Sequence, residues 1–244
     1  MRNRTGLAVE AAAHAKSNSG IKVTSRTIGG IEITDTKVSE DAAKCFGMRC
    51  GRYINIEASP KAEIVCALLK RGLEQLIVPR GTVLVVGIGN TDITQDSLGP
   101  KVAGLLAPHI GKRYRVRVFT AAVAAKTGVD TAQMVKAAVG AARADFVIAV
   151  DALACEVVNR IGRTVQLTDT GITPGAGASA ARGELSETVL GVPCVAVGVP
   201  TVAELSSVTG SREHRGMLVS TADCDAMIQI WAEVIATAIN AALR

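Results

Sequence analysis

The sequence is poor in aromatic residues and contains no long apolar run. Its 244 residues include only one Trp, two Tyr and three Phe, although 48% are hydrophobic. A core built mainly from small aliphatic side chains suits a sheet packed closely by helices. No apolar run reaches the ~20 residues that a membrane span needs, and the opening residues 1–20 lack the apolar stretch of a secretory signal. We therefore expect a cytoplasmic protein with no membrane partner.

Cysteine and histidine are present without the spacings that would make them ligands. None of the six cysteines forms a CxxC pair, so reduced thiols are expected rather than a disulfide scaffold or a zinc site. The three histidines, at 14, 109 and 214, are scattered, and none follows a strand beside a carboxylate. The residues therefore give no local support for a metal centre, a Ser/His/Asp triad or a bound cofactor.

The basic residues form no long run. A net charge of +5 over 27 Lys and Arg is a weak indication of an acidic or nucleic-acid-bound partner, and a solvated surface explains it equally well. We therefore expect no direct contact with nucleic acid.

The most informative part of the chain is a series of apolar runs separated by helical patterns. Residues 82–89 read Thr-Val-Leu-Val-Val-Gly-Ile-Gly, a run typical of a central parallel strand buried on both faces. Similar runs follow at 116–120, 146–150, 165–167 and 192–197, and helix-like segments at 98–110 and 130–142 separate the first three. Alternation of strand and helix predicts a mostly parallel sheet with helices on both faces.

The two ends of the chain complete this prediction. Residues 21–58 alternate modestly and predict short antiparallel or edge strands around a helix at 39–47. Ser59 and Pro60 are expected to begin a helix that runs to about residue 77, and residues 223–243 predict a long final amphipathic helix. The expected fold is one α/β domain over 1–244: a three-layer α/β/α, phosphorylase/hydrolase-like arrangement with residues 1–58 as a small β-containing appendage.

Carboxylates follow two of the predicted parallel strands. Asp92 and Asp96 lie in the loop after the first strand, and Asp151 stands directly at the end of the strand 146–150. Ligand sites of open α/β sheets lie at the carboxyl ends of the strands, so Asp96 and Asp151 are expected to share a cleft. A carboxylate pair can share a proton, one member acting as base towards water while the other polarises a carbonyl group. Spacing alone leaves an alternative equally open, in which Asp96 caps the next helix and Asp151 stabilises a turn.

Other readings of these loops are weaker. Gly87-Ile-Gly-Asn-Thr-Asp resembles a dinucleotide-binding loop, but Asp92 replaces the third glycine and would repel a pyrophosphate. Asp169-Thr-Gly resembles one loop of a pepsin-like protease, yet it occurs once and is better read as a turn beside the cleft. The glycine-rich segment 171–179 could border a substrate groove. We assign substrate contacts to Asn90, Asp169, Gly175 and Gly177, and no metal ligands.

Several of these segments together resemble the germination protease family, in their order and in their separations. The resembling segments are Val85-Val-Gly-Ile-Gly-Asn90, Thr94-Gln-Asp-Ser-Leu-Gly-Pro-Lys101, Ala149-Val-Asp-Ala-Leu-Ala154, Asp169-Thr-Gly-Ile172, Pro174-Gly-Ala-Gly177 and Val197-Gly-Val-Pro-Thr-Val202. Leu7-Ala-Val-Glu-Ala11, Gly51-Arg-Tyr53 and the final helix extend the likeness over nearly the whole chain.

The resemblance implies an atypical aspartic endopeptidase of the spore core. Such an enzyme degrades small acid-soluble spore proteins during germination, and the family's catalytic aspartates correspond to Asp96 and Asp151. The resemblance also implies a homotetramer, synthesis as a zymogen, and a fold shared with hydrogenase maturation endopeptidases. Two alternatives remain open: a hydrogenase-maturation-like peptidase that senses a metal on its substrate, and a non-catalytic regulatory relative.

The chain departs from the family in three places. The family's pro-segment precedes the Leu-Ala-Val-Glu element, whereas only residues 1–6 precede it here, so we expect trivial or absent autoprocessing. Thr173 stands where the family has a histidine, which removes a potential third metal ligand. The stretch 204–216 is shorter than in the family, and this difference could alter the oligomer or the substrate groove.

Overall fold

The computed structural model describes residues 5–13, 20–46, 48–174 and 183–244. Its strands are β1 Ile21–Ile28, β2 Ile31–Val38, β3 Gly51–Glu57, β4 Gly81–Gly89, β5 His109–Ile110, β6 Tyr114–Ala122, β7 Phe146–Cys155, β8 Thr164–Thr168, β9 Cys194–Glu204 and β10 Leu218–Val219. Its α-helices are α1 Ala8–Ala13, α2 Glu40–Phe46, α3 Val65–Glu74, α4 Leu98–Leu105, α5 Ala124–Thr127, α6 Thr131–Ala142, α7 Glu187–Leu190, α8 Leu205–Thr209 and α9 Cys224–Ala242. The short 3-10 turns of the described residues are η1 Thr94–Asp96, η2 Val158–Arg160 and η3 Arg212–His214.

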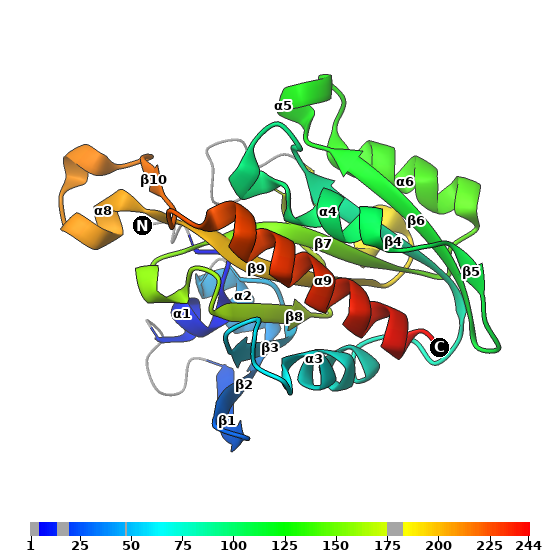
Figure 1. Cartoon of the computed structure of the whole chain (residues 1–244), viewed down its shortest axis with the longest axis horizontal. Coiled ribbons are helices and arrows are strands. Elements are labelled where there is room, and N and C mark those ends of the chain that lie inside the picture. Colours follow the sequence, from blue (N-terminus) through cyan, green and yellow to red (C-terminus); the bar gives the residue numbers. More distant parts are fainter. Residues whose placement is uncertain (1–4, 14–19, 47, 175–182) are drawn as a thin grey trace.

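One twisted sheet runs through the molecule, with a parallel centre and antiparallel flanks. Its order is β1-β2-β3-β8-β9-β7-β4-β6-β5, and β10 pairs with β9 (Figure 1). The pairs β4–β6, β4–β7 and β7–β9 are parallel, as their continuous apolar runs predicted. Strand β8 runs antiparallel to both β3 and β9, and through it the amino-terminal strands extend the same sheet.

Helices cover both faces of the sheet, so the predicted three-layer α/β/α fold is confirmed. Side chains of α3, α4 and α9 form the larger core with one face of the sheet, and α6 packs on the other face. Helix α9 buries Ile228, Trp231, Ile235 and Ile239, whose spacing of three and four residues places them on one side of the helix. No helix in the described part of the chain combines the length and the apolar character needed to cross a bilayer.

Two predicted helices are shorter than the pattern suggested. The prediction of a helix from Pro60 is wrong, because residues 59–64 form successive turns, in which Ser59 accepts the amide of Ala62, and α3 begins at Val65. The helix predicted for 98–110 ends at Leu105. Residues 109 and 110 form β5 instead, since the backbone before Pro108 is biased towards extended conformations.

Helix α1 is fixed to the end of β7 by a buried carboxylate. Glu10 is 4% exposed and accepts the backbone amides of Glu156 and Val157, at 2.8 and 3.0 Å. Arg160 lies 3.6 Å from the same carboxylate and supplies a compensating charge. This arrangement holds the start of the described chain against the strand that carries Asp151.

Candidate functional site

The loop after β4 and the end of β7 lie side by side at the carboxyl edge of the parallel strands. Gly87 of β4 pairs with Val150 of β7, the residue immediately before Asp151. The loop that follows β4 contains η1, which ends in Asp96 and contacts both β7 and β9. The topology therefore brings together the two aspartates that the sequence assigned to one cleft.

Two glycines let the η1 segment lie directly on the strands. Gly89 has φ +146°, and a Cβ atom there would stand 1.9 Å from the carbonyl oxygen of Asp96. That carbonyl accepts the amide of Asn90 at 3.0 Å, which closes the loop. A Cβ atom on Gly99 would stand 2.4 Å from the carbonyl oxygen of Val150, so α4 begins in close contact with β7. Larger residues at either position would push Asp96 away from Asp151.

A buried threonine of β9 forms a third attachment of η1. Leu153 of β7 pairs with Pro200 of β9, but the next residue, Ala154, pairs with Val202. The register between β7 and β9 therefore shifts by one residue at this point. Thr201 is therefore the extra residue of a β-bulge, a feature that often redirects a side chain beside a functional site. Its Oγ1 donates to the carbonyl oxygen of Gln95 at 2.7 Å, and its exposed fraction is 1%. Sequence reasoning missed this role, although a proline inside a central strand is itself a sign of a bulge.

Thr201 should therefore act as a positioning residue for Asp96. We expect Thr201→Val to lower kcat about 10-fold with little change in KM, because Asp96 loses an anchor while the pocket is kept. The measurement is kcat and KM against pH for the wild type, Thr201→Val and Thr201→Ser. The serine variant keeps the hydroxyl and should restore most of the rate and the wild-type acidic limb. Equal losses in both variants would reduce Thr201 to a packing residue.

Burial raises the pKa of both carboxyl groups, but to different extents. Asp151 is 3% exposed, and its Oδ1 accepts the amide of Ala152 at 2.9 Å. Burial, and secondarily the negative charge of Asp96, raise the pKa of Asp151 well above its ordinary value. Burial also raises the pKa of Asp96, to about 6. Asp151, the more deeply buried group, therefore holds its proton more strongly than Asp96 does, the asymmetry expected of an acid/base pair.

Asp92 and Asn90 stay outside this pair. Lys126 lies 2.7 Å from the carboxylate of Asp92, and this hydrogen-bonded ion pair lowers the pKa of that exposed group. The side-chain oxygen of Asn90 accepts the amide of Asp92 at 3.0 Å, so it stabilises the loop. The assignment of Asn90 to substrate contact stays a prediction.

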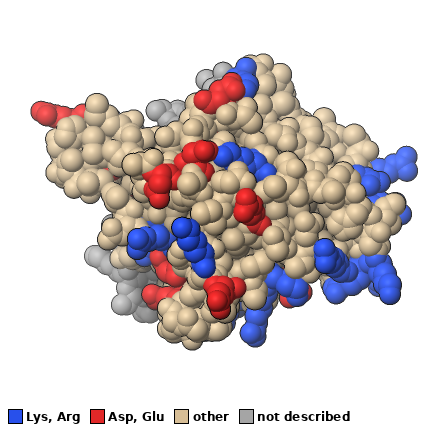
Figure 2. Space-filling model, in the orientation of Figure 1, with Lys and Arg blue, Asp and Glu red and all other residues tan. Residues whose placement is uncertain are grey.

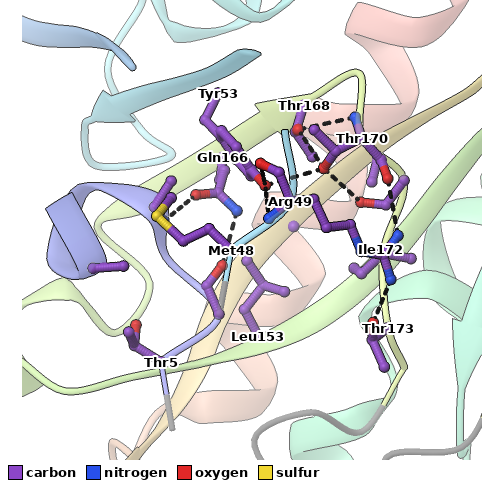
Figure 3. A pocket seen from close by; sticks show the side chains of 16 residues that line it. Thr5, Met48, Arg49, Tyr53, Leu153, Gln166, Thr168, Thr170, Ile172 and Thr173 are labelled. Atoms are coloured by element: carbon purple, nitrogen blue, oxygen red, sulfur yellow. Dashed lines mark hydrogen bonds between the residues drawn. The ribbon is translucent and has the colours of Figure 1, made fainter. Parts of the chain in front are cut away.

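A pocket of about 150 Å³ borders the strand that carries Asp151 (Figure 3). Gly198, the register partner of Asp151 on β9, lines it, as does Leu153, two residues beyond Asp151 on the same face of β7. Figure 3 shows Tyr53, Gln166 and Thr168 along one side of the pocket, and Arg49 and Thr170 close to them. Neither Asp96 nor Asp151 lines the pocket, but a hollow with a few polar groups beside the strand that carries Asp151 can accept a substrate side chain.

The polar wall of the pocket is held by its own hydrogen bonds. Arg49 donates to the carbonyl oxygen of Thr170 at 2.9 Å and to the hydroxyl group of Thr173 at 2.5 Å, and it lies 3.2 Å from Glu184. The hydroxyl group of Tyr53 donates to the carbonyl oxygen of Arg49 at 3.0 Å. Sequence reasoning did not single out Arg49, but it placed residues 169–171 beside the cleft, and Thr170 and Gly171 line this pocket.

The other residues predicted to contact substrate do not line the pocket in the described part of the chain. Asp169 is exposed and accepts the amide of Arg52 at 2.7 Å, which fixes the start of β3, while the neighbouring Thr170 reaches the pocket. The assignment of Asp169 to substrate binding stays a prediction. Gly175 and Gly177 lie outside the described residues. Among the residues that are described, no group of three or more His, Cys, Asp or Glu side chains could hold a metal ion.

Comparison with known families decides the classification. A sequence model described as Peptidase_A25, germination protease, matches residues 5–214. The chain belongs to the germination protease family. Curated members are similar: the germination protease of Bacillus subtilis (strain 168) is 36% identical over 232 residues, covering 82% of this chain and 63% of that protein. The germination protease of Oceanobacillus iheyensis is 33% identical, with 84% and 65% covered, and that of Priestia megaterium is 31% identical with the same coverage.

The chain thus spans somewhat less than two thirds of the length of these germination proteases. Among solved structures, a [NiFe] hydrogenase maturation protease HycI from Thermococcus kodakarensis KOD1 is similar, with 20% sequence identity and a TM-score of 0.43. That similarity covers 69% of this chain and 98% of the other.

Proposed function

We propose that this chain is an endopeptidase that initiates the degradation of small acid-soluble spore proteins during germination, with Asp96 and Asp151 as its acid/base pair. The observation that carries the proposal is the asymmetric pair of carboxyl groups at one strand edge, in a member of the germination protease family. Neither carboxyl group has a basic partner among the ion pairs of the described residues. Both therefore remain available for proton transfer.

The two carboxyl groups have distinct roles in the proposed reaction. Ionised Asp96 removes a proton from a water molecule as the water oxygen attacks the carbonyl carbon of the scissile peptide bond. Protonated Asp151 donates a hydrogen bond, and then its proton, to the carbonyl oxygen. The amide of Ala152 occupies Oδ1 of Asp151, which leaves Oδ2 to carry the transferred proton. When the tetrahedral intermediate collapses, the proton on Asp96 passes to the leaving amine and the new carbonyl group returns its proton to Asp151, so the pair is regenerated.

The proposal also covers the location of the enzyme, its assembly and its need for a cofactor. The substrates place the enzyme in the cytoplasm of the forespore and in the spore core. We include a homotetrameric assembly in the proposal, as expected for the family. No cofactor takes part, since the two carboxyl groups and water supply every proton that moves.

The test is intact-mass analysis of a purified small acid-soluble spore protein after incubation with this chain. We expect discrete fragments whose yield is unchanged by a chelator or by added nickel. Fragments that depend on nickel would favour a hydrogenase-maturation-like peptidase. Binding of the substrate without fragments under any condition would favour a non-catalytic regulatory relative.

A further inference from the structure

The amino-terminal ends of the parallel strands carry a concentration of basic side chains. The exposed residues of this surface, which we call the basic end, are Arg80, Lys112, Arg113, Arg115 and Arg143. Figure 2 shows blue side chains predominating at the right-hand end of the molecule, where Figure 1 places β5, β6 and the carboxyl end of α9. The fold therefore gathers on one surface the charges that the sequence scatters over three segments.

Backbone contacts establish that these segments are neighbours. The amide of Gly81 donates to the carbonyl oxygen of Arg113 at 3.1 Å, so Arg80 and Arg113 flank the junction of β4 and β6. Arg115 pairs with Thr82 on one side and with Ile110 on the other. On the far side of β4, the amide of Asp145, two residues after Arg143, donates to the carbonyl oxygen of Thr82 at 2.7 Å.

The positive charge of the basic end is largely uncompensated. None of the ion pairs between described residues involves one of its Arg or Lys side chains. Asp145, a carboxylate near them, accepts the amide of Thr82 at 2.6 Å and forms none of these ion pairs. Arg113 is held in place, since its guanidinium donates to the carbonyl oxygen of Pro79 and lies 5.5 Å from the ring centre of Tyr114. Like charges held together without partners favour an anionic ligand.

We propose that the basic end binds the phosphate backbone of duplex nucleic acid, which replaces the expectation from the sequence that the chain makes no direct contact with nucleic acid. Arginine predominates over lysine in it, as suits phosphate recognition. The nearby aromatic rings of Tyr114 and Phe146 are 2% and 0% exposed, so no platform is offered for stacking single-stranded bases. An acidic protein partner would call for apolar anchors at the centre of the surface. Ile110, the strand partner of Arg115, is an exposed large apolar side chain at this surface, whereas all five residues that define the basic end are cationic.

This surface is separate from the peptidase site. Strand β4 has 9 residues, so its two ends lie roughly 27 Å apart. The basic end is at the amino terminus of β4, whereas the loop with Asp96 follows its carboxyl terminus. A duplex bound at the basic end leaves the carboxyl pair and the neighbouring pocket open, so the enzyme can remain on nucleic acid while it cleaves a protein.

The test is fluorescence anisotropy of a short labelled DNA duplex of mixed sequence, titrated with the full chain between about 50 and 200 mM salt. We expect micromolar binding at low salt, with a slope of log Kobs against log salt of about −3 to −4, as about four phosphate contacts would give. Arg80→Glu/Lys112→Glu should weaken binding at least about 10-fold and flatten the slope by about 2. These two side chains make no hydrogen bond or ion pair within the described structure, so the variant should fold.

The matched control is Lys22→Glu/Lys37→Glu, which changes the net charge equally on the β1–β2 hairpin. Lys22 and Lys37 are exposed cross-strand partners, so the control removes two neighbouring positive charges from a different surface. We expect it to change the affinity less than about twofold. Equal losses in both variants, a loss in the control alone, tighter binding of polyglutamate than of the duplex, or no binding at low salt would each overturn the proposal. Peptide cleavage, measured in parallel, should be unchanged in both variants.

Discussion

Asp151→Asn is expected to lower the rate of peptide cleavage by about 10²–10⁴-fold without destabilising the fold. Asparagine can still accept the amide of Ala152, but it cannot transfer a proton to the substrate carbonyl. Because burial disfavours the charge of Asp151 and unfolding relieves that penalty, a neutral amide should leave the melting temperature equal or higher. Asp96→Asn should cause a similar loss of rate, since it removes the base that activates water.

The matched control is Asp92→Asn, in the same loop. Asp92 is exposed, is paired with Lys126 and lies outside the carboxyl pair, so the rate should change less than twofold. Because the pair acts as a unit, the double variant of Asp96 and Asp151 should be little slower than either single variant. Steady-state rates and thermal melts of all four proteins check these expectations. Substantial activity in the Asp96 and Asp151 variants, or an equal loss in Asp92→Asn, would remove the pair from the mechanism.

The second large effect is on the pH dependence of kcat/KM. Asp96 acts as a base only when ionised, and burial raises its pKa to about 6. The rate should therefore be nearly constant around neutrality and fall about tenfold for each pH unit below about 6. The alkaline limb should report loss of the proton of Asp151, whose pKa burial raises well above its ordinary value. Initial rates in buffers of constant ionic strength give this profile.

The contribution of Asp96 to folding stability should fall as the pH rises towards about 6, whereas the rate rises over that pH range. The pKa of Asp96 is higher in the folded chain than in the unfolded chain, so the native state holds that proton to a higher pH. Its contribution to stability is present below about pH 4 and is lost as the pH rises through about 6. Melting temperatures and rates measured in the same buffers should therefore change in opposite directions with pH. An acidic limb centred near pH 4 would instead mean that Asp96 titrates like an exposed carboxyl group.

The central strands and the carboxyl pair could be predicted because local sequence determines them. A buried parallel strand must be apolar throughout, and carboxylates placed just after two neighbouring strands meet at one edge. The attachment of η1 by Thr201 could not be predicted, because it depends on a shift in register between two strands. The pocket and the basic end each need segments far apart in the chain, so neither leaves a local pattern. The start of α3 at Val65 was missed because Ser59 and Pro60 suit a helix start and a turn equally well.

Strand β9 contributes to the pocket and to the position of Asp96 through two residues that are only three positions apart. Gly198 stands beside Asp151 and lines the pocket, while Thr201 holds the turn that carries Asp96. Successive side chains of a strand alternate between faces, so gaining or losing one residue between these positions would rotate one of them to the wrong side of the sheet. This stretch can therefore exchange residues more readily than it can change length. In protein engineering or in evolution, the spacing between Gly198 and Thr201 is therefore the dimension that keeps the pocket and Asp96 in a fixed relation to each other.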